Sequence, residues 1–183
     1  MTAPGFALFE TAIGACAIAW NDRGVAGLQL PEADAAAARA RIARRFEGAV
    51  EAPAPPDVER AIEGITALLR GEAIDLAFVP LDMAGVPTFE RSVYEIARAI
   101  APGKTRTYGE IARELGGDPG AARAVGQALG RNPFPIVVPC HRVLAAAGGL
   151  GGFSAHGGTR TKQRLLDIEG AKTGRTPGLF DEL

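Results

Sequence analysis

The sequence predicts a mixed α/β (α+β) protein made of two domains and a short tail. Strand-like apolar segments lie in the first half of the 183 residues, and from Thr88 onward the apolar residues recur with helical spacing. A segment with glycine and proline, residues 83–87, separates the two patterns. We therefore expect an N-terminal domain over 1–86, a second domain over 87–172, and a tail over 173–183. A chain of this length can bury a substantial core.

The N-terminal domain is expected to combine an antiparallel sheet with helices. Apolar segments flank a polar turn at 21–24, which indicates a hairpin. An alanine- and arginine-rich segment with Ile42 and Phe46 four residues apart predicts one helix, and Asp57 as N-cap predicts the start of another. The expected strands are 6–10, 13–20, 25–30 and 74–81, and the expected helices are 32–46 and 58–69.

The second domain is expected to be mainly helical. Its first helix places five apolar side chains on one face, namely Phe89, Val93, Ile96, Ala97 and Ile100. Thr107 and Glu110 have the spacing of a capping box, which predicts a short helix beginning at Tyr108. Asp118, followed by proline, predicts the start of the next helix. Two helices joined by a glycine turn form a candidate helix-turn-helix.

The second helix of this unit consists mostly of small residues, and Arg123 is its long cation. Little side-chain bulk lets a helix approach a partner closely, so contact with DNA is one interpretation. The other is that alanine and glycine only permit tight helix packing and that Arg123 is a solvated surface side chain. The small residues are Ala121, Ala122, Ala124, Gly126 and Ala128.

Charge is distributed unevenly along the chain, although the net charge is only −1. Residues 1–86 carry 7 basic and 12 acidic side chains, a balance of −5, whereas residues 87–172 carry 12 basic and 7 acidic, a balance of +5. A basic half in a nearly neutral protein suggests an anionic partner for that half. Solvated surface arginines are the alternative.

A cysteine stands directly beside a histidine at the end of an apolar segment. Residues 136–138 are apolar, Pro139 ends the segment, and Cys140 and His141 follow. The thiolate is the reactive form of cysteine and needs a base or a cation nearby, so this pair is a candidate nucleophile and base.

A carboxylate could complete this pair. The last expected helix, 159–168, buries Leu165 and Leu166, and Glu169 lies on that same face. Burying an unpaired charge is costly, so an inward carboxylate needs a partner, and the His141 imidazole would give a thiol, base and carboxylate in the order of a catalytic triad. The alternative is a frayed helix end with Glu169 in water.

Other segments limit the possible classes of function. The glycine-rich loop 148–158 lacks a Gly-Lys-Ser/Thr element, so a phosphate-binding loop is not supported, and His156 within it is expected to be exposed. The two cysteines, Cys16 and Cys140, cannot form a disulfide framework or a cysteine zinc site. With no membrane span or secretory signal evident, we expect a cytoplasmic protein.

The motifs of the second half, taken together, resemble those of the O6-alkylguanine-DNA alkyltransferases (methylated-DNA–protein-cysteine methyltransferases). The active-site signature is Pro139-Cys140-His141-Arg142-Val143, preceded by Asn132-Pro133. The resemblance extends over residues 88–170 and includes Thr107-Tyr108, Ala121-Ala122-Arg123-Ala124-Val125-Gly126 and Leu165-Leu166-Asp167-Ile168-Glu169-Gly170. It implies a helical second domain with a winged-helix-like helix-turn-helix, and the N-terminal half matches only loosely.

The resemblance implies direct and irreversible DNA repair without a cofactor or metal. Cys140 would accept the alkyl group from O6-alkylguanine, or from O4-alkylthymine, in double-stranded DNA. His141, acting through a water and oriented by Glu169, would take the thiol proton, and Tyr108 would rotate the phosphate and protonate the leaving base. Such a protein is expected to act as a monomer.

The resemblance also implies roles in binding. Arg123 would replace the flipped base in the stack, and the remaining DNA contacts would come from Thr107, Ala122, Ala124 and Gly126. Asn132 and Arg142 would be structural. The guanine pocket would be formed by Asn132, Pro135, Val143, Phe153 and Ser154. Many members have tyrosine at the position of Phe153, and the loop after Ser154 is about two residues longer here, through Ala155-His156.

Two other classes of function compete with alkyl transfer. A DNA-binding regulator or lesion sensor without chemistry would explain the helix-turn-helix and the basic half, but not Cys140, His141 and Glu169 together. A cysteine hydrolase would use the same three residues but would turn over many times.

Overall fold

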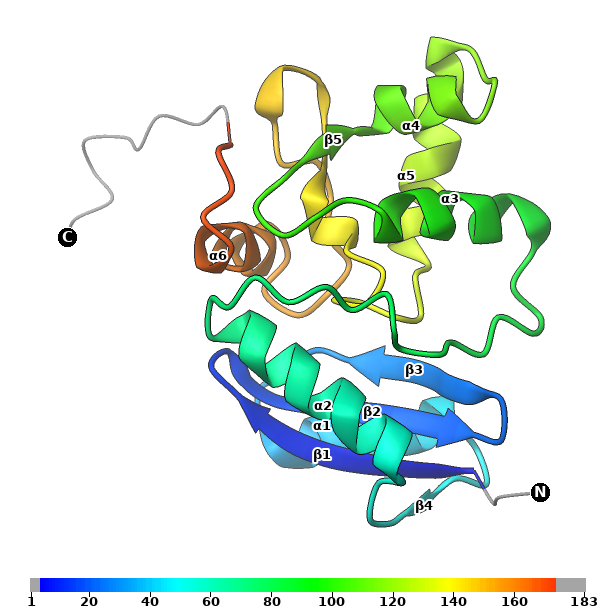
Figure 1. The fold of residues 1–183 in the computed structure, drawn as a ribbon, viewed down its shortest axis with the longest axis vertical. Coiled ribbons are helices and arrows are strands. Elements are labelled where there is room, and N and C mark those ends of the chain that lie inside the picture. The colour runs from blue at the N-terminus through cyan, green and yellow to red at the C-terminus, as the bar shows by residue number, and fades with distance from the viewer. Residues whose placement is uncertain (1–3, 174–183) are drawn as a thin grey trace, which may run out of the picture.

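The computed structural model describes residues 4–173, so that all of the expected tail except Thr173 lies outside the described residues (Figure 1). The strands are β1 Gly5–Thr11, β2 Gly14–Asn21, β3 Gly24–Gln29, β4 Val50–Glu51, β5 Arg106–Thr107 and β6 Val143–Leu144. The helices are α1 Ala35–Arg45, α2 Pro56–Leu69, α3 Thr88–Arg98, α4 Tyr108–Glu114, α5 Ala122–Gly130 and α6 Thr159–Ile168, with 3₁₀ turns η1 Pro119–Ala121, η2 Cys140–Arg142 and η3 Ala146–Gly148. Within this part of the chain, no helix is both long and apolar enough to span a membrane.

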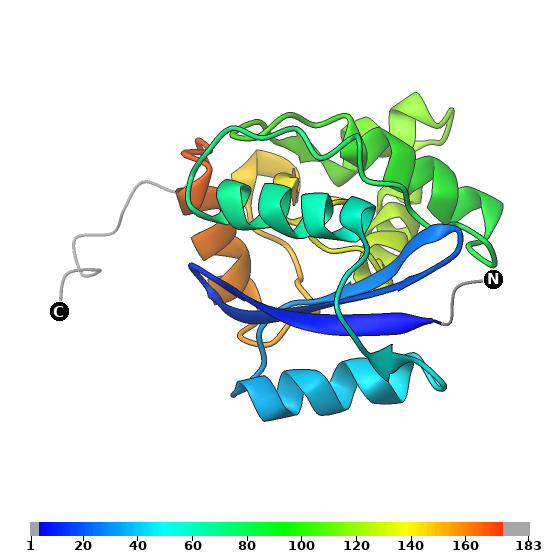
Figure 2. The ribbon, with the colours of Figure 1, turned by 60° about the horizontal axis from the view of Figure 1, so that its bottom comes forward.

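The N-terminal half is built on a four-stranded sheet in the order β3-β2-β1-β4. The first three strands pair antiparallel, as expected, and the short β4 adds a parallel strand beside β1. Side chains of β2 alternate between the two faces: Ala17 and Ala19 pack with Ile42 of α1, whereas Ile18 and Trp20 belong to the core that includes α2. Figure 2 shows α1 and α2 on opposite faces of the sheet.

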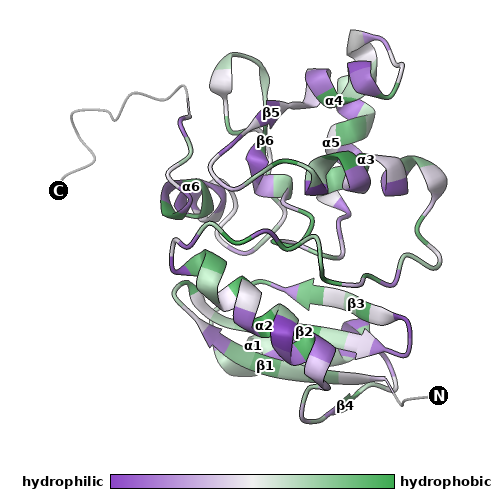
Figure 3. Cartoon of the chain, in the orientation of Figure 1, coloured by the Kyte–Doolittle hydropathy of each residue, from purple (hydrophilic) through white to green (hydrophobic). Residues whose placement is uncertain are grey.

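Two sequence expectations for this half are wrong. Segment 74–81 forms no regular strand and makes only a single bridge, between Leu81 and Val25, while Leu76 and Val79 are buried as the chain crosses toward α3. Asp57 is not an N-cap, because α2 already begins at Pro56; the carboxylate lies in the first helical turn, where it still complements the helix dipole. In Figure 3, α2 alternates between hydrophobic and hydrophilic segments, as an amphipathic helix should.

The second half follows the expected order of helices. The capping box is present: the Thr107 hydroxyl accepts from the backbone N–H of Glu110, and the Glu110 carboxylate accepts from the backbone N–H of Thr107. Asp118 accepts from the N–H groups of two following residues and opens the turn that leads into α5. Phe89 is an exception to the predicted buried face of α3, because it is 41% exposed; the buried aromatic side chain is Tyr94, whose hydroxyl donates to the Ala128 carbonyl.

The two halves share one hydrophobic core. It includes Ile18 and Leu28 from the sheet together with Val93 and Val138 from the second half. Backbone bonds also cross between them, since the N–H of Leu28 donates to the Pro133 carbonyl at 2.9 Å. Because the two halves share a core, the domain boundary expected after Val86 stays a prediction from the sequence.

Candidate active site

Cys140 lies at the start of the turn η2, at the end of a buried apolar segment. Ile136, Val137 and Val138 are each at most 3% exposed and anchor this segment in the core. Asn132 braces the segment on one side: its Nδ2 donates to the Val138 carbonyl at 2.8 Å, and its Oδ1 accepts from the backbone N–H of Phe134 at 2.9 Å. The side chain of Asn132 thus holds both ends of the turn that precedes the thiol.

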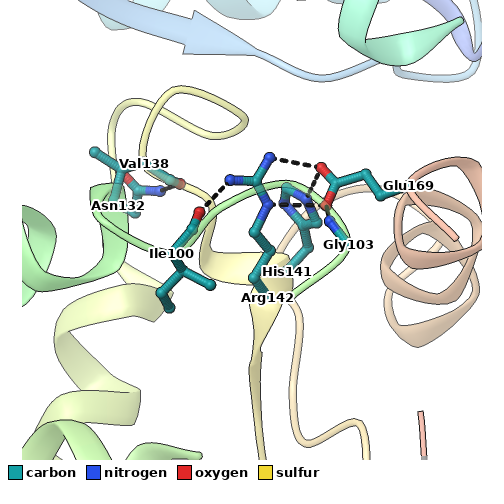
Figure 4. A network of polar contacts seen from close by, with 7 residues as sticks. All are labelled: Ile100, Gly103, Asn132, Val138, His141, Arg142 and Glu169. Carbon is teal, nitrogen blue, oxygen red and sulfur yellow. Dashed lines mark hydrogen bonds and ion pairs between the residues drawn. The ribbon is translucent and has the colours of Figure 1, made fainter. Parts of the chain in front are cut away.

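His141, Arg142 and Glu169 form a buried network (Figure 4). The Nε2 atom of His141 lies 2.9 Å from Glu169 Oε1, and Arg142 donates from Nε and Nη2 to the two carboxylate oxygens at 2.8 Å. Arg142 also donates to the Ile100 carbonyl, and the Gly103 N–H donates to Glu169. The side chain of Glu169 is only 3% exposed. The alternative of a frayed helix end with this carboxylate in water is therefore wrong.

The ionisation of this network follows from burial and hydrogen bonding. Burial alone would raise the pKa of Glu169, but hydrogen bonds from His141 and Arg142 outweigh it and lower the pKa to about 2. Burial lowers the pKa of His141, which favours the neutral imidazole. With Nε2 donating its proton to the carboxylate, Nδ1 is left as an acceptor, and it has no partner among residues 4–173.

The thiol of Cys140 is held in its protonated form at rest. Burial raises its pKa, and this effect exceeds the opposing influence of the Asn132 amide and of the positive charge on Lys162. A group with this environment needs a base to become a nucleophile. Nδ1 of the neighbouring His141 is the unpaired acceptor in this network, as far as the described residues go.

Lys162 of α6 is a residue that the sequence interpretation missed. It is fully buried, and its Nζ donates to the Val143 carbonyl at 2.7 Å and to the Tyr108 hydroxyl at 3.3 Å. Burial lowers its pKa to about 8, while the nearby Cys140 has the opposite effect. Helical spacing could have indicated that Lys162 is buried. It precedes Leu165 and Leu166 by three and four residues, and so lies on the same inward face as Glu169.

A cavity of about 550 Å³ brings together seven of the predicted site residues, including Cys140, Tyr108 and Arg123. It lies between the start of α4, the surface of α5 and the glycine-rich loop. Thr107 lines an adjoining cavity of about 700 Å³ that also reaches Arg123 and Ala122. Four residues that line the first of these cavities, of about 550 Å³, were not predicted: Gln127, Leu129, Gly130 and Gly152. The lining is Tyr108, Ala122, Arg123, Gly126, Gln127, Leu129, Gly130, Cys140, Gly152, Phe153 and Ser154.

The other residues predicted for the pocket, and Ala124, do not line the cavity of about 550 Å³. Val143 is buried, and its carbonyl accepts from Lys162. Asn132 and Pro135 line a separate, smaller cavity that also reaches Cys140. Ala124 lines none of these three cavities.

The surface of α5 suits close approach by a partner. Arg123 is exposed, and the small Ala122, Ala124 and Gly126 beside it are partly exposed. Gly126 faces the ring of Tyr108, and a Cβ atom there would make an ordinary van der Waals contact with the ring at 3.8 Å.

Comparison with known proteins connects this geometry to a family. A family model described as the DNA-binding domain of 6-O-methylguanine DNA methyltransferase matches residues 88–171. A methylated-DNA–protein-cysteine methyltransferase of Methanothermobacter thermautotrophicus is 33% identical over 153 residues, which cover 84% of this chain and 78% of the relative. The crystal structure of Mycobacterium tuberculosis O6-methylguanine methyltransferase is similar with a TM-score of 0.72 and 33% identity, and covers 96% of each chain. A structure of the same enzyme in complex with DNA has a TM-score of 0.72 and 32% identity, and covers 93% of this chain and 96% of that one.

Proposed function

Because this chain belongs to the methylated-DNA–protein-cysteine methyltransferase family, we propose that it repairs O6-alkylguanine in double-stranded DNA by transferring the alkyl group irreversibly to Cys140. The observation that carries the proposal is that a buried cysteine lines the same cavity as a small-residue helix bearing an exposed arginine. O4-alkylthymine, whose alkyl group is bonded to oxygen in the same way, is a second expected substrate.

The nucleophile is generated within the buried network. The His141 imidazole takes the thiol proton at Nδ1, through a water, while its Nε2–H remains bonded to Glu169. Glu169 stabilises the imidazolium that forms, and Arg142 holds the carboxylate in place with two hydrogen bonds. Attack at a saturated carbon favours a thiolate over a hydroxyl, which is consistent with cysteine at this position.

DNA is bound through α5 and the base is extruded into the cavity. The target atom cannot be reached in a stacked duplex, so flipping is required at a cost of a few kcal/mol. Arg123 enters the stack and offsets the lost stacking, while Ala122, Ala124 and Gly126 allow close approach to the minor groove. Thr107, at the N-terminus of α4, binds the backbone beside the site.

Within the cavity the flipped base is bound next to the thiol. Phe153 packs beside the guanine, and Ser154, whose hydroxyl donates to the Gly130 carbonyl in this structure, supplies a polar contact. Tyr108 protonates the leaving base, and its hydroxyl is already oriented by Lys162. The backbone around Val143 and the ring of Pro135 complete the walls. The protein acts as a monomer, and a reducing cytoplasmic setting keeps Cys140 free.

The test is transfer of one methyl group from DNA to Cys140. Incubation with a duplex containing O6-methylguanine should increase the intact mass of the protein by one methyl, with one transfer per molecule and the modified peptide containing Cys140. Cys140→Ser should lose transfer, whereas the matched Cys16→Ser, at a buried cysteine outside the cavity, should retain it. Full transfer by Cys140→Ser would overturn the proposal, and repeated turnover would favour a hydrolase. Binding of the lesion by the wild-type protein without mass change would favour a sensor.

A further inference from the structure

A second cavity, of about 80 Å³, reaches Cys140 from the N-terminal half; we refer to it as the rear cavity. It lies between β3 and α1 on one side and the loop that carries Phe153 and Ser154 on the other. Cys140, Phe153 and Ser154 line both this cavity and the larger one. Cys140 therefore borders both cavities.

Two cations of α1 line the rear cavity. Arg41 lies 3.0 Å from the Glu32 carboxylate. Arg45 is held by its Nη1 donating to the Leu28 carbonyl at 3.2 Å and by its position 5.1 Å from the centre of the Phe46 ring. Among residues 4–173, no carboxylate pairs with Arg45. The rear cavity therefore has one positive charge more than its acidic neighbour can neutralise.

The two guanidinium groups are close enough to influence one another. Desolvation and the positive charge of Arg41 both lower the pKa of Arg45, so the pair would be stabilised by an added negative charge. Glu32 supplies a single negative charge and lies against Arg41, so it leaves the charge of Arg45 unmatched.

We propose that the rear cavity receives the far end of O6-alkyl groups that are longer than methyl and negatively charged, and that Arg45, assisted by Arg41, determines this specificity. The simplest such group is O6-carboxymethyl. This inference rests on the proposed function, since it concerns the alkyl group that Cys140 accepts. It assigns to the N-terminal half a direct contact with the substrate.

The chemistry gives the arginines a specific task. The Cys140 thiolate attacks the CH₂ carbon, a C–S bond forms, and the C–O6 bond breaks with its electron pair passing to the guanine, which takes up a proton. The product is S-carboxymethylcysteine and unmodified guanine. A carboxylate one bond from the reacting carbon repels the approaching thiolate, and this repulsion is strong where water is excluded. A cation at the far end of the alkyl group offsets it without changing the reaction at a methyl group.

The experiment compares duplexes containing O6-carboxymethylguanine and its neutral isostere O6-carbamoylmethylguanine, with O6-methylguanine as reference. Single-turnover rates are measured for wild type, Arg45→Gln, Arg45→Lys and the Arg41→Gln/Arg45→Gln double variant. Arg44→Gln is the matched control, because Arg44 is an exposed neighbour on α1 that does not line the cavity. The quantity of interest is the rate for the carboxylate divided by the rate for the amide.

We expect Arg45→Gln to lower this ratio about fivefold, as fits one ion pair at an exposed arginine, and the double variant to lower it further. Arg45→Lys should largely retain it, Arg44→Gln should leave it unchanged, and O6-methyl transfer should be the same throughout. An unchanged ratio in Arg45→Gln and the double variant, or an equal fall in Arg44→Gln, would overturn the inference. If the wild-type protein transferred no methyl group from O6-methylguanine, the proposed function itself would instead be refuted.

Discussion

Glu169 is the residue on which the buried network of the active site depends. Its carboxylate accepts two hydrogen bonds from Arg142 and one from His141, with almost no exposure to solvent. Removing one partner of a buried ion pair costs about 3–5 kcal/mol, because the other charge is left uncompensated. The same residue should therefore influence both stability and transfer.

We expect Glu169→Gln to lower the free energy of unfolding by about 3 kcal/mol at neutral pH. Because folding lowers the pKa of Glu169 to about 2, its contribution is present above the ordinary pKa near 4.5 and is lost as the pH falls toward 2. The difference between wild type and variant should therefore shrink over that interval. Denaturant unfolding across this pH range measures it, with Asp167→Asn, on the exposed side of α6, as control. A difference that is constant with pH would contradict the assignment.

A second residue-scale prediction concerns Lys162. Its buried ammonium lies near the thiol, so replacing it by methionine removes a positive charge that favours the thiolate. We expect the pH midpoint for reaction of Cys140 with iodoacetamide to rise in Lys162→Met, and the rate at neutral pH to fall about tenfold, the equivalent of one pKa unit. Peptide mass spectrometry follows Cys140 specifically, and Lys172→Met is the exposed control. An unchanged midpoint would show that Lys162 serves only through its hydrogen bonds to the Val143 carbonyl and the Tyr108 hydroxyl.

At the scale of elements, local rules predicted the helices around the site well. The capping box at Thr107 and the Asp118 start signal are set by side chains within three residues, so they can be found without knowledge of the fold. The inward position of Glu169 follows equally from helical spacing. Its contact with His141 crosses 28 residues, however, so the sequence raised it only as one of two alternatives, and the family resemblance favoured it.

The errors at this scale occurred where tertiary contacts override local pattern. Segment 74–81 has strand-like composition, but it makes only one bridge to the sheet and crosses the core as a connection. Phe89 fits the apolar period of α3 yet lies at the first turn of the helix, beyond the core. The structural role expected of Arg142 is not among these errors, but its bond to the Ile100 carbonyl joins residues 42 positions apart and could not be predicted from local pattern. The rear cavity could not be predicted either, because its walls come from both halves of the chain.

On the scale of the whole molecule, the two halves are joined through the connection between α2 and α3. Arg98, at the end of α3, donates from Nη2 to the carbonyls of Leu76, Ala77 and Val79 at 3.0–3.3 Å. This one side chain satisfies carbonyls of a segment that has no regular secondary structure. The connection in turn bonds to β3, since the N–H of Val25 donates to the Pro80 carbonyl at 2.9 Å.

The last prediction follows from this arrangement. Arg98→Met keeps the apolar stem but removes the donor from three carbonyls, and should lower the free energy of unfolding by about 2 kcal/mol. Arg91→Met, on the same helix, removes a single exposed bond to the Met83 carbonyl and should cost less than about 1 kcal/mol. Denaturant unfolding measures both.

If the connection also holds the sheet and α1 against the second half, Arg98→Met should slow transfer of extended alkyl groups more than transfer of methyl, because only the extended groups reach the rear cavity. Equal destabilisation by the two variants would show that the connection contributes nothing specific to the joining of the halves.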